Sequence, residues 1–206
     1  MGFAELRKLK GIFVHPASLL SRYPFAVSLV VSLKRCGSYD SSTEDDFAFP
    51  ILDVAAKKVG AYIRGQGHGA KVILADKRVG RDSPIYWRGE ISHKAVAKTA
   101  GLGWIGRSTL LVTPDLGPRV CLATVLTDMP VPVGRPLRNR CGACEACVRA
   151  CPEGALRCAR FSEHPARIED SIDVGTCDLR VEKTHAQGIL CFKCMLACPK
   201  GVIARP

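Results

Sequence analysis

Hydrophobic positions in the first part of the chain alternate between the spacing of strands and the spacing of helices. The pattern predicts, in chain order, a strand, a helix, a strand, a helix and two further strands. These are Phe25–Leu33, Phe47–Arg64, Ala70–Ala75, Ser92–Ala100, Thr109–Val112 and Val120–Leu126. The acidic, serine-rich stretch from Ser38 to Asp46 predicts a loop before the first helix. The order of elements predicts a mixed sheet flanked by helices.

The first predicted helix is amphipathic. Its apolar residues recur every three or four positions, which predicts one face turned toward a core. That face comprises Ile51, Leu52, Ala55, Ala56, Val59, Tyr62 and Ile63.

The composition changes at Met129–Pro136, where three prolines follow a predicted strand. Prolines at this density interrupt regular structure, so they indicate a linker between domains. We therefore expect an α/β domain over 1–128, a proline-rich linker over 129–140 and a second domain over 141–206. The predicted fold class is α+β.

The second domain is defined by its cysteines. The chain has eleven cysteines, and seven of them fall into two blocks. The blocks are Cys141, Cys144, Cys147 and Cys151-Pro152, then Cys191, Cys194 and Cys198-Pro199. The first block has the spacing by which bacterial ferredoxins bind [4Fe-4S] clusters, with three thiolates on one cluster and the fourth on its neighbour. The sequence therefore predicts a ferredoxin-like domain with two clusters.

The second block lacks one cysteine when it is aligned with the first, because the missing position falls on Gly188. Cys177 is the nearest cysteine upstream that could supply this ligand. Crossing the fourth ligands then gives two complete sets of four thiolates. The first set is Cys141, Cys144, Cys147 and Cys198, and the second is Cys151, Cys177, Cys191 and Cys194.

Structural zinc sites and disulfides are the alternatives to clusters. Zinc sites usually use two separated pairs of cysteines, whereas three cysteines at successive C-x2-C spacing favour a compact cluster. A chain of this length can bury a core without disulfides, which makes cross-links less favoured. Of the remaining cysteines, Cys121 is expected in the core of a strand, and Cys36 and Cys158 are expected to be free thiols.

Composition and charge favour a cytoplasmic protein that does not enter the membrane. The longest apolar run, Pro24–Leu33, has about half the length of a bilayer-spanning helix, and Lys34 follows it where a signal peptide would have a cleavage site. The formal net charge of +11 favours an acidic redox partner or a nucleic acid, although a basic soluble protein with neither partner fits it equally well.

The segment Gly101–Gly106 matches the glycine pattern of dinucleotide-binding sites. That fingerprint requires a strand before the glycines and a helix after them. Here the predicted order is reversed, with a helix before and a strand after. We therefore interpret the motif as a tight turn that carries Trp104 past another part of the backbone.

Residues 100–112, the strand end Leu126–Asp128 and the two cysteine blocks together resemble the epoxyqueuosine reductases, corrinoid-dependent enzymes of tRNA modification, and their short relatives. The resemblance covers residues 92–199. It implies two [4Fe-4S] clusters that supply electrons to a cobalamin lying against the N-terminal domain. It also implies corrinoid contacts at Trp104, Arg107, Ser108 and Thr109, although this chain has Arg107-Ser108 where the family commonly has Lys-His.

The family's proton donor is an aspartate upstream of the glycine motif. Counting back without a gap reaches Trp87, so Asp82 is the candidate only if the intervening loop is longer here. General acid catalysis requires the carboxyl within hydrogen-bond reach of the reacting atom, so this offset matters. His93 and Lys94 also precede the motif, and we expect them to form an exposed pair at the start of a helix.

These observations favour an iron–sulfur oxidoreductase that passes electrons to a corrinoid or a substrate at the N-terminal domain. A ferredoxin or flavodoxin would be a suitable electron donor. Epoxyqueuosine reduction in tRNA is the alternative activity that the resemblance implies. A ferredoxin-like carrier without catalysis is a second alternative, but about 128 residues outside the cluster domain favour the enzyme.

Overall fold

A computed structural model describes residues 1–9, 14–33, 45–75, 89–157, 162, 168–186 and 191–201, with the side chains of 45–47 left out. The chain forms two compact units, and each combines segments that are distant in sequence. The first unit comprises Met1–Val31, Ala48–Gly103 and Cys121–Leu137, and the second comprises Ser32–Phe47, Trp104–Val120 and Arg138–Pro206. No helix in the described part of the chain has both the length and the apolar character needed to cross a membrane.

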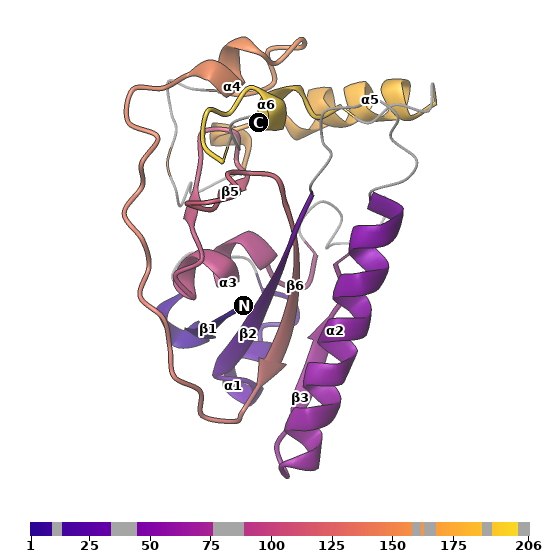
Figure 1. Cartoon of the computed structure of the whole chain (residues 1–206), viewed down its shortest axis with the longest axis vertical. Coiled ribbons are helices and arrows are strands. Elements are labelled where there is room, and N and C mark those ends of the chain that lie inside the picture. Colours follow the sequence, from indigo (N-terminus) through magenta and orange to yellow (C-terminus); the bar gives the residue numbers. More distant parts are fainter. Residues whose placement is uncertain are drawn as a thin grey trace, which may run out of the picture. The chain divides into compact units, whose positions relative to one another are not determined.

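The first unit is built on a four-stranded sheet with the order β1-β2-β6-β3 (Figure 1). Strand β1 (Gly2–Glu5) pairs antiparallel with β2 (Phe25–Ser32). Strand β3 (Ala70–Ile73) pairs antiparallel with β6 (Val120–Thr127). The strands predicted at β2, β3 and β6 are confirmed within a residue or two of their ends, whereas β1 was not predicted. Cys121 is buried in β6, as the sequence predicted.

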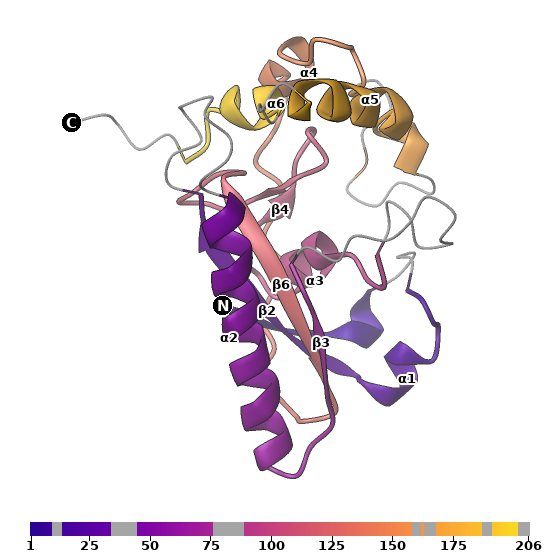
Figure 2. The ribbon, with the colours of Figure 1, turned by 90° about the vertical axis from the view of Figure 1, so that its right-hand side faces the viewer.

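Helix α2 (Asp45–Gly65) runs beside β3 (Figures 1 and 2). Gly60 makes this approach close, because a Cβ there would lie 2.8 Å from Cγ2 of Val72. The predicted apolar face is correct at Leu52, Ala56 and Ile63, which are buried.

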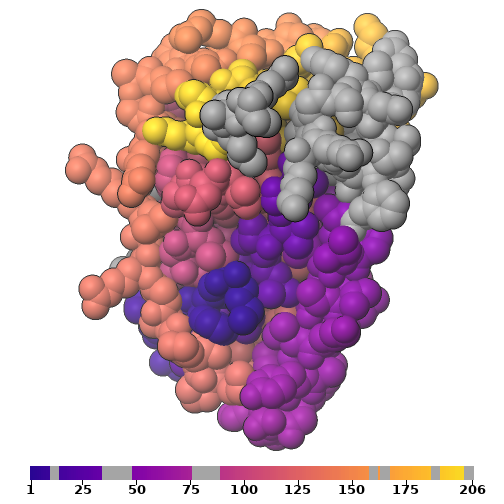
Figure 3. Space-filling view, viewed as in Figure 1, coloured from indigo at the N-terminus to yellow at the C-terminus, as the bar shows by residue number. Residues whose placement is uncertain are grey.

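The predicted face of α2 is wrong at Ile51 and Tyr62, whose exposed fractions are 56% and 64%. The buried stripe of the helix is narrower than its apolar pattern because the helix contacts the sheet along one line. The outer side of α2, purple in the space-filling view, is open to solvent (Figure 3).

The main core of the first unit lies between the sheet and its short helices. Helix α3 (His93–Thr99) begins at Ser92, whose hydroxyl accepts a hydrogen bond from Ala95 N at 3.3 Å. This helix packs against β1 and the 3-10 helix η1 (Leu6–Lys8). Helix α1 (Leu19–Arg22) contributes to the same core. The buried residues of this core are Ala4, Leu6, Leu9, Leu19, Tyr23, Ala26, Ile73, Ile91, Ala95, Val96, Ala100 and Leu126.

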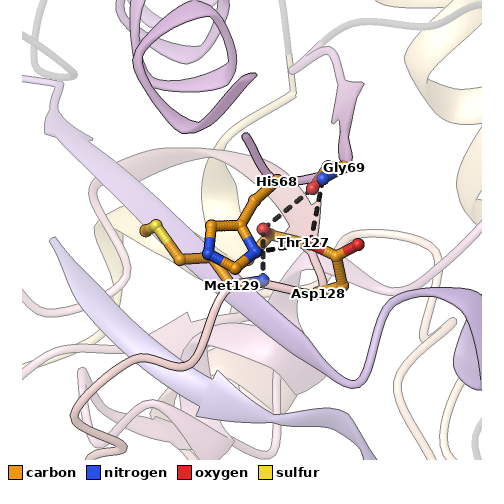
Figure 4. Close-up of polar contacts among 5 residues, drawn as sticks. All are labelled: His68, Gly69, Thr127, Asp128 and Met129. Carbon is orange, nitrogen blue, oxygen red and sulfur yellow. Dashed lines mark hydrogen bonds and ion pairs between the residues drawn. The ribbon is translucent and has the colours of Figure 1, made fainter. Parts of the chain in front are cut away.

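The end of β6 is fastened to the start of β3 by polar contacts (Figure 4). Asp128 Oδ1 accepts a hydrogen bond from Gly69 N at 2.9 Å and lies 3.1 Å from His68 Nδ1. The Thr127 hydroxyl donates to Gly69 O and accepts from Met129 N, both at 2.9 Å. The Thr-Asp pair at the end of the strand therefore fixes the edge of the sheet.

In its described residues, the second unit contains a small hairpin and four helical segments. Strand β4 (Trp104–Ile105) pairs antiparallel with β5 (Leu111–Val112). The strand predicted over Thr109–Val112 is shorter than expected, because Thr109 has a φ of 60° and belongs to the turn. The helical segments are α4 (Ala146–Arg149), η3 (Ile168–Asp170), α5 (Val174–His185) and α6 (Lys193–Leu196).

The order of elements around the glycine motif is helix, motif, hairpin. Helix α3 precedes Gly101 and strand β4 follows it, whereas a dinucleotide-binding motif needs a strand before the glycines and a helix after them. The motif is therefore not a dinucleotide-binding site. The hairpin belongs to the second unit although it precedes the proline-rich stretch in sequence.

Candidate iron–sulfur site

The loop that carries the first cysteine block is positioned by Asn139. The Asn139 side chain accepts a hydrogen bond from Cys141 N at 2.7 Å and donates one to Ile105 O at 2.9 Å. Cys144 N then donates to Cys141 O at 3.0 Å, which closes a turn in which Gly142 has a φ of 53°. One amide side chain therefore joins the cysteine loop to strand β4.

The last part of the glycine motif lies directly against the same loop. A Cβ at Gly106 would lie 3.5 Å from the Sγ of Cys141 and 2.7 Å from Cγ2 of Val112. Arg107 donates from Nη2 to Gly142 O at 3.0 Å. The third glycine of the motif is therefore required for close packing against a cysteine rather than for binding a nucleotide.

The two cysteine blocks form a local structural repeat. Cys147 lies in α4 and Cys194 lies in α6, and these helices pack against each other. Each helix leads into a Cys-Pro turn that closes on a glycine with positive φ, 60° at Gly154 and 67° at Gly201. Cys151 N and Cys198 N make equivalent hydrogen bonds, both at 3.2 Å, to the carbonyls of Val148 and Met195.

Helix α5 carries Cys177 and is joined at its start to the segment that follows Cys151. Asp173 caps this helix by accepting a hydrogen bond from Thr176 N at 3.0 Å, and Cys177 lies in its first turn. A bridge between Leu156 and Ile172 ties the start of α5 to the segment after Cys151. The Arg157–Asp173 ion pair at 3.1 Å reinforces this connection.

The first cysteine group is defined as Cys141, Cys144, Cys147 and Cys198, and two of its thiols, Cys147 and Cys198, have a raised pKa. The pKa of the Cys147 thiol is raised to about 11, first by burial and then by the neighbouring Cys141 and, more weakly, Cys198. Burial also raises the pKa of the Cys198 thiol, and Cys141 and Cys144 add to the rise. Cys198 therefore lies near enough to Cys141 and Cys144 for their charges to affect its pKa, although it is distant from them in sequence.

The second cysteine group is defined as Cys151, Cys177, Cys191 and Cys194, and two of its thiols, Cys177 and Cys194, have a raised pKa. Burial raises the pKa of the Cys194 thiol to about 12, with Cys177 and Cys191 the next causes and then Cys147 and Cys151. Burial, Cys151 and Cys191 raise the pKa of Cys177. The influence of Cys147 on Cys194 joins the two groups.

The other predicted site residues are found in different surroundings. Trp104 and Ser108 are buried, with exposed fractions of 1% and 5%. Asp82, Trp87, Gly188, Cys36 and Cys158 lie outside the described residues, as do residues 38–44 of the predicted loop. Among the described residues, no set of three or more His, Cys, Asp and Glu side chains is close enough to hold a single metal ion.

The expectation that His93 and Lys94 form an exposed pair is wrong, because both are partly buried. His93 Nε2 donates to Leu74 O at 3.1 Å, and in this tautomer Nδ1 accepts from the Thr124 hydroxyl at 2.7 Å. Burial lowers the pKa of His93 and that of Lys94. His93 therefore has a structural role that joins α3 to β6.

The cysteine geometry agrees with a match to a known domain family. The 4Fe-4S binding domain matches residues 137–157, which include the whole first block. The chain is thus an iron–sulfur protein in which a 4Fe-4S binding segment accompanies a mixed α/β fold.

The particular relatives are epoxyqueuosine reductases. The protein of that name from Listeria monocytogenes is 47% identical over 68 residues, which cover 33% of this chain and 18% of the relative. The one from Vibrio cholerae is 33% identical over 119 residues, covering 53% and 30%. The resemblance predicted from the motifs is confirmed. The matched part spans less than a third of the length of these relatives.

Solved structures agree on the fold. A crystal structure of selenomethionine-labelled epoxyqueuosine reductase superposes with a TM-score of 0.62 at 19% identity, covering 97% of this chain and 61% of that one. A catabolic reductive dehalogenase gives a TM-score of 0.67 at 22% identity, covering 86% and 26%. The mixed α/β architecture with an antiparallel sheet is therefore shared with these proteins.

Proposed function

We propose that the chain is an iron–sulfur oxidoreductase that binds two [4Fe-4S] clusters. The first cysteine group holds one cluster and the second cysteine group holds the other. Electrons enter from a donor such as a ferredoxin or flavodoxin in the cytoplasm and pass through both clusters. They then reduce a substrate bound by the α/β part of the chain, which we take to be residues 1–128.

The grouping of the thiols carries this proposal. Cys147 and Cys198 respond to partners within the first group, and Cys177 responds to Cys151 and Cys191 of the second. This division supports the crossed ligand scheme that the spacing predicts, including Cys177 in place of the missing position at Gly188. The contact between α4, which carries Cys147, and α6, which carries Cys194, would bring the two proposed clusters near each other, as electron transfer between them requires.

The donor set fits the proposed clusters. Four thiolates are the usual ligands of a [4Fe-4S] cluster, which supplies one-electron transfer when it is bound. The thiols must lose their protons to bind iron, and the raised pKa of Cys147 and Cys194 means that these protons are held tightly before assembly. The turns at Gly142, Gly154 and Gly201 hold the backbone so that the cysteines converge.

The side chains implied for corrinoid contact fit that role poorly. Trp104 and Ser108 are buried, and Arg107 donates to Gly142 O within the cysteine loop. Thr109, in a turn with a φ of 60°, is half-buried. The proposed reaction is therefore written with a substrate as the electron acceptor, and a corrinoid acceptor is the alternative that the resemblance implies.

Epoxyqueuosine reduction in tRNA is the second candidate function. It is favoured by the sequence relatives, and one related solved structure is an epoxyqueuosine reductase with a tRNA stem loop. The net charge of +11 suits a nucleic-acid substrate. Asp82 is the candidate proton donor for this reaction. Loss of queuosine formation in Asp82→Asn, with full iron content, is the expected result, and an unchanged yield would remove Asp82 from that role.

Metal analysis of anaerobically reconstituted full-length protein tests the main proposal. Two clusters require about eight irons and about eight sulfides per chain. About two zinc ions without sulfide would refute it. Cys177→Ala should keep about four irons, because only the second group loses a ligand. Cys158→Ala is the matched control between the two blocks, and it should keep all eight; the reverse outcome would contradict the crossed scheme.

The enzyme and the carrier differ in what the α/β part does. An enzyme should retain a reducible ligand there, whereas a carrier needs this part only for docking. The test is gel filtration of the reconstituted protein after incubation with cobalamin or with an epoxyqueuosine-containing tRNA stem loop. Co-elution of either ligand, followed by its reduction with dithionite, supports the enzyme. Failure to retain or reduce either one, with eight irons present, supports the carrier.

A further inference from the structure

The loop between β5 and β6 is fastened to the segment around Cys198. Arg119 donates from Nη1 to Lys200 O at 3.4 Å and to Gly201 O at 3.3 Å, and from Nη2 to Leu196 O at 3.4 Å. The three carbonyls lie before and after Cys198 in sequence, so one guanidinium brackets this cysteine. Leu196 is the last residue of α6, and its carbonyl lacks a partner within the helix.

The two backbones also touch directly. A Cβ at Gly117 would overlap Lys200 O, and a Cβ at Gly201 would overlap the backbone of Leu116. Both glycines have positive φ, 59° and 67°, which side chains rarely adopt. This contact therefore needs glycine on both sides, and it holds the turn after Cys198 against the Arg119 loop.

Arg119 is itself held in place by its own backbone. Its carbonyl accepts a hydrogen bond from Leu33 N at 2.9 Å, and its N–H donates to Leu116 O at 3.3 Å. Thr113 and Gly117 close the preceding turn through two backbone hydrogen bonds of 2.8 and 3.0 Å. The guanidinium is thus presented from a fixed loop, which lowers the entropy cost of its contacts.

The guanidinium charge lies near the cysteine, because it contacts carbonyls two residues before and two and three residues after Cys198. A fixed positive charge at this position stabilises additional negative charge on a cluster bound to Cys198. Cys198 is the one ligand that the C-terminal block would supply to the first cluster.

We propose that Arg119 is a positioning residue for the first cluster. Arg119 holds the segment around Cys198 in place and raises the reduction potential of the cluster. The inference rests on the proposed function, because it assumes a cluster on Cys141, Cys144, Cys147 and Cys198. Each cluster gains one negative charge on reduction, so a nearby fixed positive charge favours the reduced form. The first cluster would then accept electrons more readily than it would beside a neutral residue.

The test compares two variants. Arg119→Gln removes the positive charge and the guanidinium, whereas Arg119→Lys retains the positive charge. Arg7→Gln is the matched control, because it removes an exposed arginine of the first unit, outside the segments that carry the cysteines. Each full-length variant is reconstituted anaerobically, its iron is counted, and both cluster potentials are measured by electron paramagnetic resonance during a redox titration.

Arg119→Gln should lower one of the two potentials so that the ratio of reduced to oxidised cluster falls about tenfold, about 59 mV for one electron, and should leave the other unchanged. Arg119→Lys should show a smaller shift, and Arg7→Gln should show none. Selective loss of about four irons from Arg119→Gln, with Arg119→Lys fully loaded, would also support the proposal. A retained cluster with unchanged potential, or equal loss of both clusters, would overturn it.

The same measurements distinguish a failure of the two-cluster proposal from a failure of the proposed role of Arg119. Wild-type protein without about eight irons per chain would refute the two-cluster proposal itself, whatever the variants do. Wild-type protein with both clusters and an Arg119→Gln variant that matches it would refute only the role of Arg119.

Discussion

Replacing Asn139 with alanine should loosen the first cluster and leave the second intact. The substitution removes the hydrogen bond from Cys141 N at 2.7 Å and the one to Ile105 O at 2.9 Å. A neutral hydrogen bond contributes roughly 0.5–1.5 kcal/mol, so the two together contribute about 1–3 kcal/mol to holding the cysteine loop on β4. Because about 1.4 kcal/mol is tenfold in an equilibrium constant, retention of the first cluster should weaken by about 5-fold to 150-fold.

The assay is bleaching of the visible iron–sulfur absorbance by an iron chelator under anaerobic conditions. In Asn139→Ala we expect two phases, with the fast phase accounting for about half the iron. Gln66→Ala is the matched control, because it removes an exposed amide from the first unit, and it should bleach like the wild type. A single phase at the wild-type rate in Asn139→Ala would refute the assignment of Asn139 as the residue that positions Cys141.

Three further predictions follow from described contacts. Gly106→Ala should reduce iron loading at the first cysteine group, because its Cβ would lie 2.7 Å from Val112 Cγ2; loading equal to the wild type would contradict this. Asp173→Ala should uncap α5 and increase its proteolysis in the apo-protein, whereas Glu182→Ala, near the other end of the helix, should change proteolysis less. Burial lowers the pKa of His93 below its ordinary 6.5, so its contribution to stability is present above that value and is lost as the pH falls. The thermal midpoint of the first unit should drop on acidification, and a flat pH profile in the wild type would count against this.

The sequence determined the strands and helices whose patterns are long or clearly bounded. β2, α2 and α3 lie close to the ranges that the strand and helix spacing of the apolar residues predicted. Such signals are local, because the period of the chain and its capping residues are read within a few residues. The spacing of the first cysteine block is equally local, and it agrees with the 4Fe-4S binding domain match at residues 137–157.

Only the tertiary structure decided which distant residues support the cysteines. Nothing in the motifs marks Asn139 or Arg119, although both hold cysteine segments through side chains that reach backbone carbonyls. The same is true of Gly106, which the sequence pattern offered as part of a nucleotide motif but which packs against Cys141. Helical spacing likewise could not show that Ile51 and Tyr62 are exposed, because the width of a buried stripe depends on what packs against it. Periodicity and spacing describe neighbours along the chain, whereas these contacts join segments that meet only when the chain is folded.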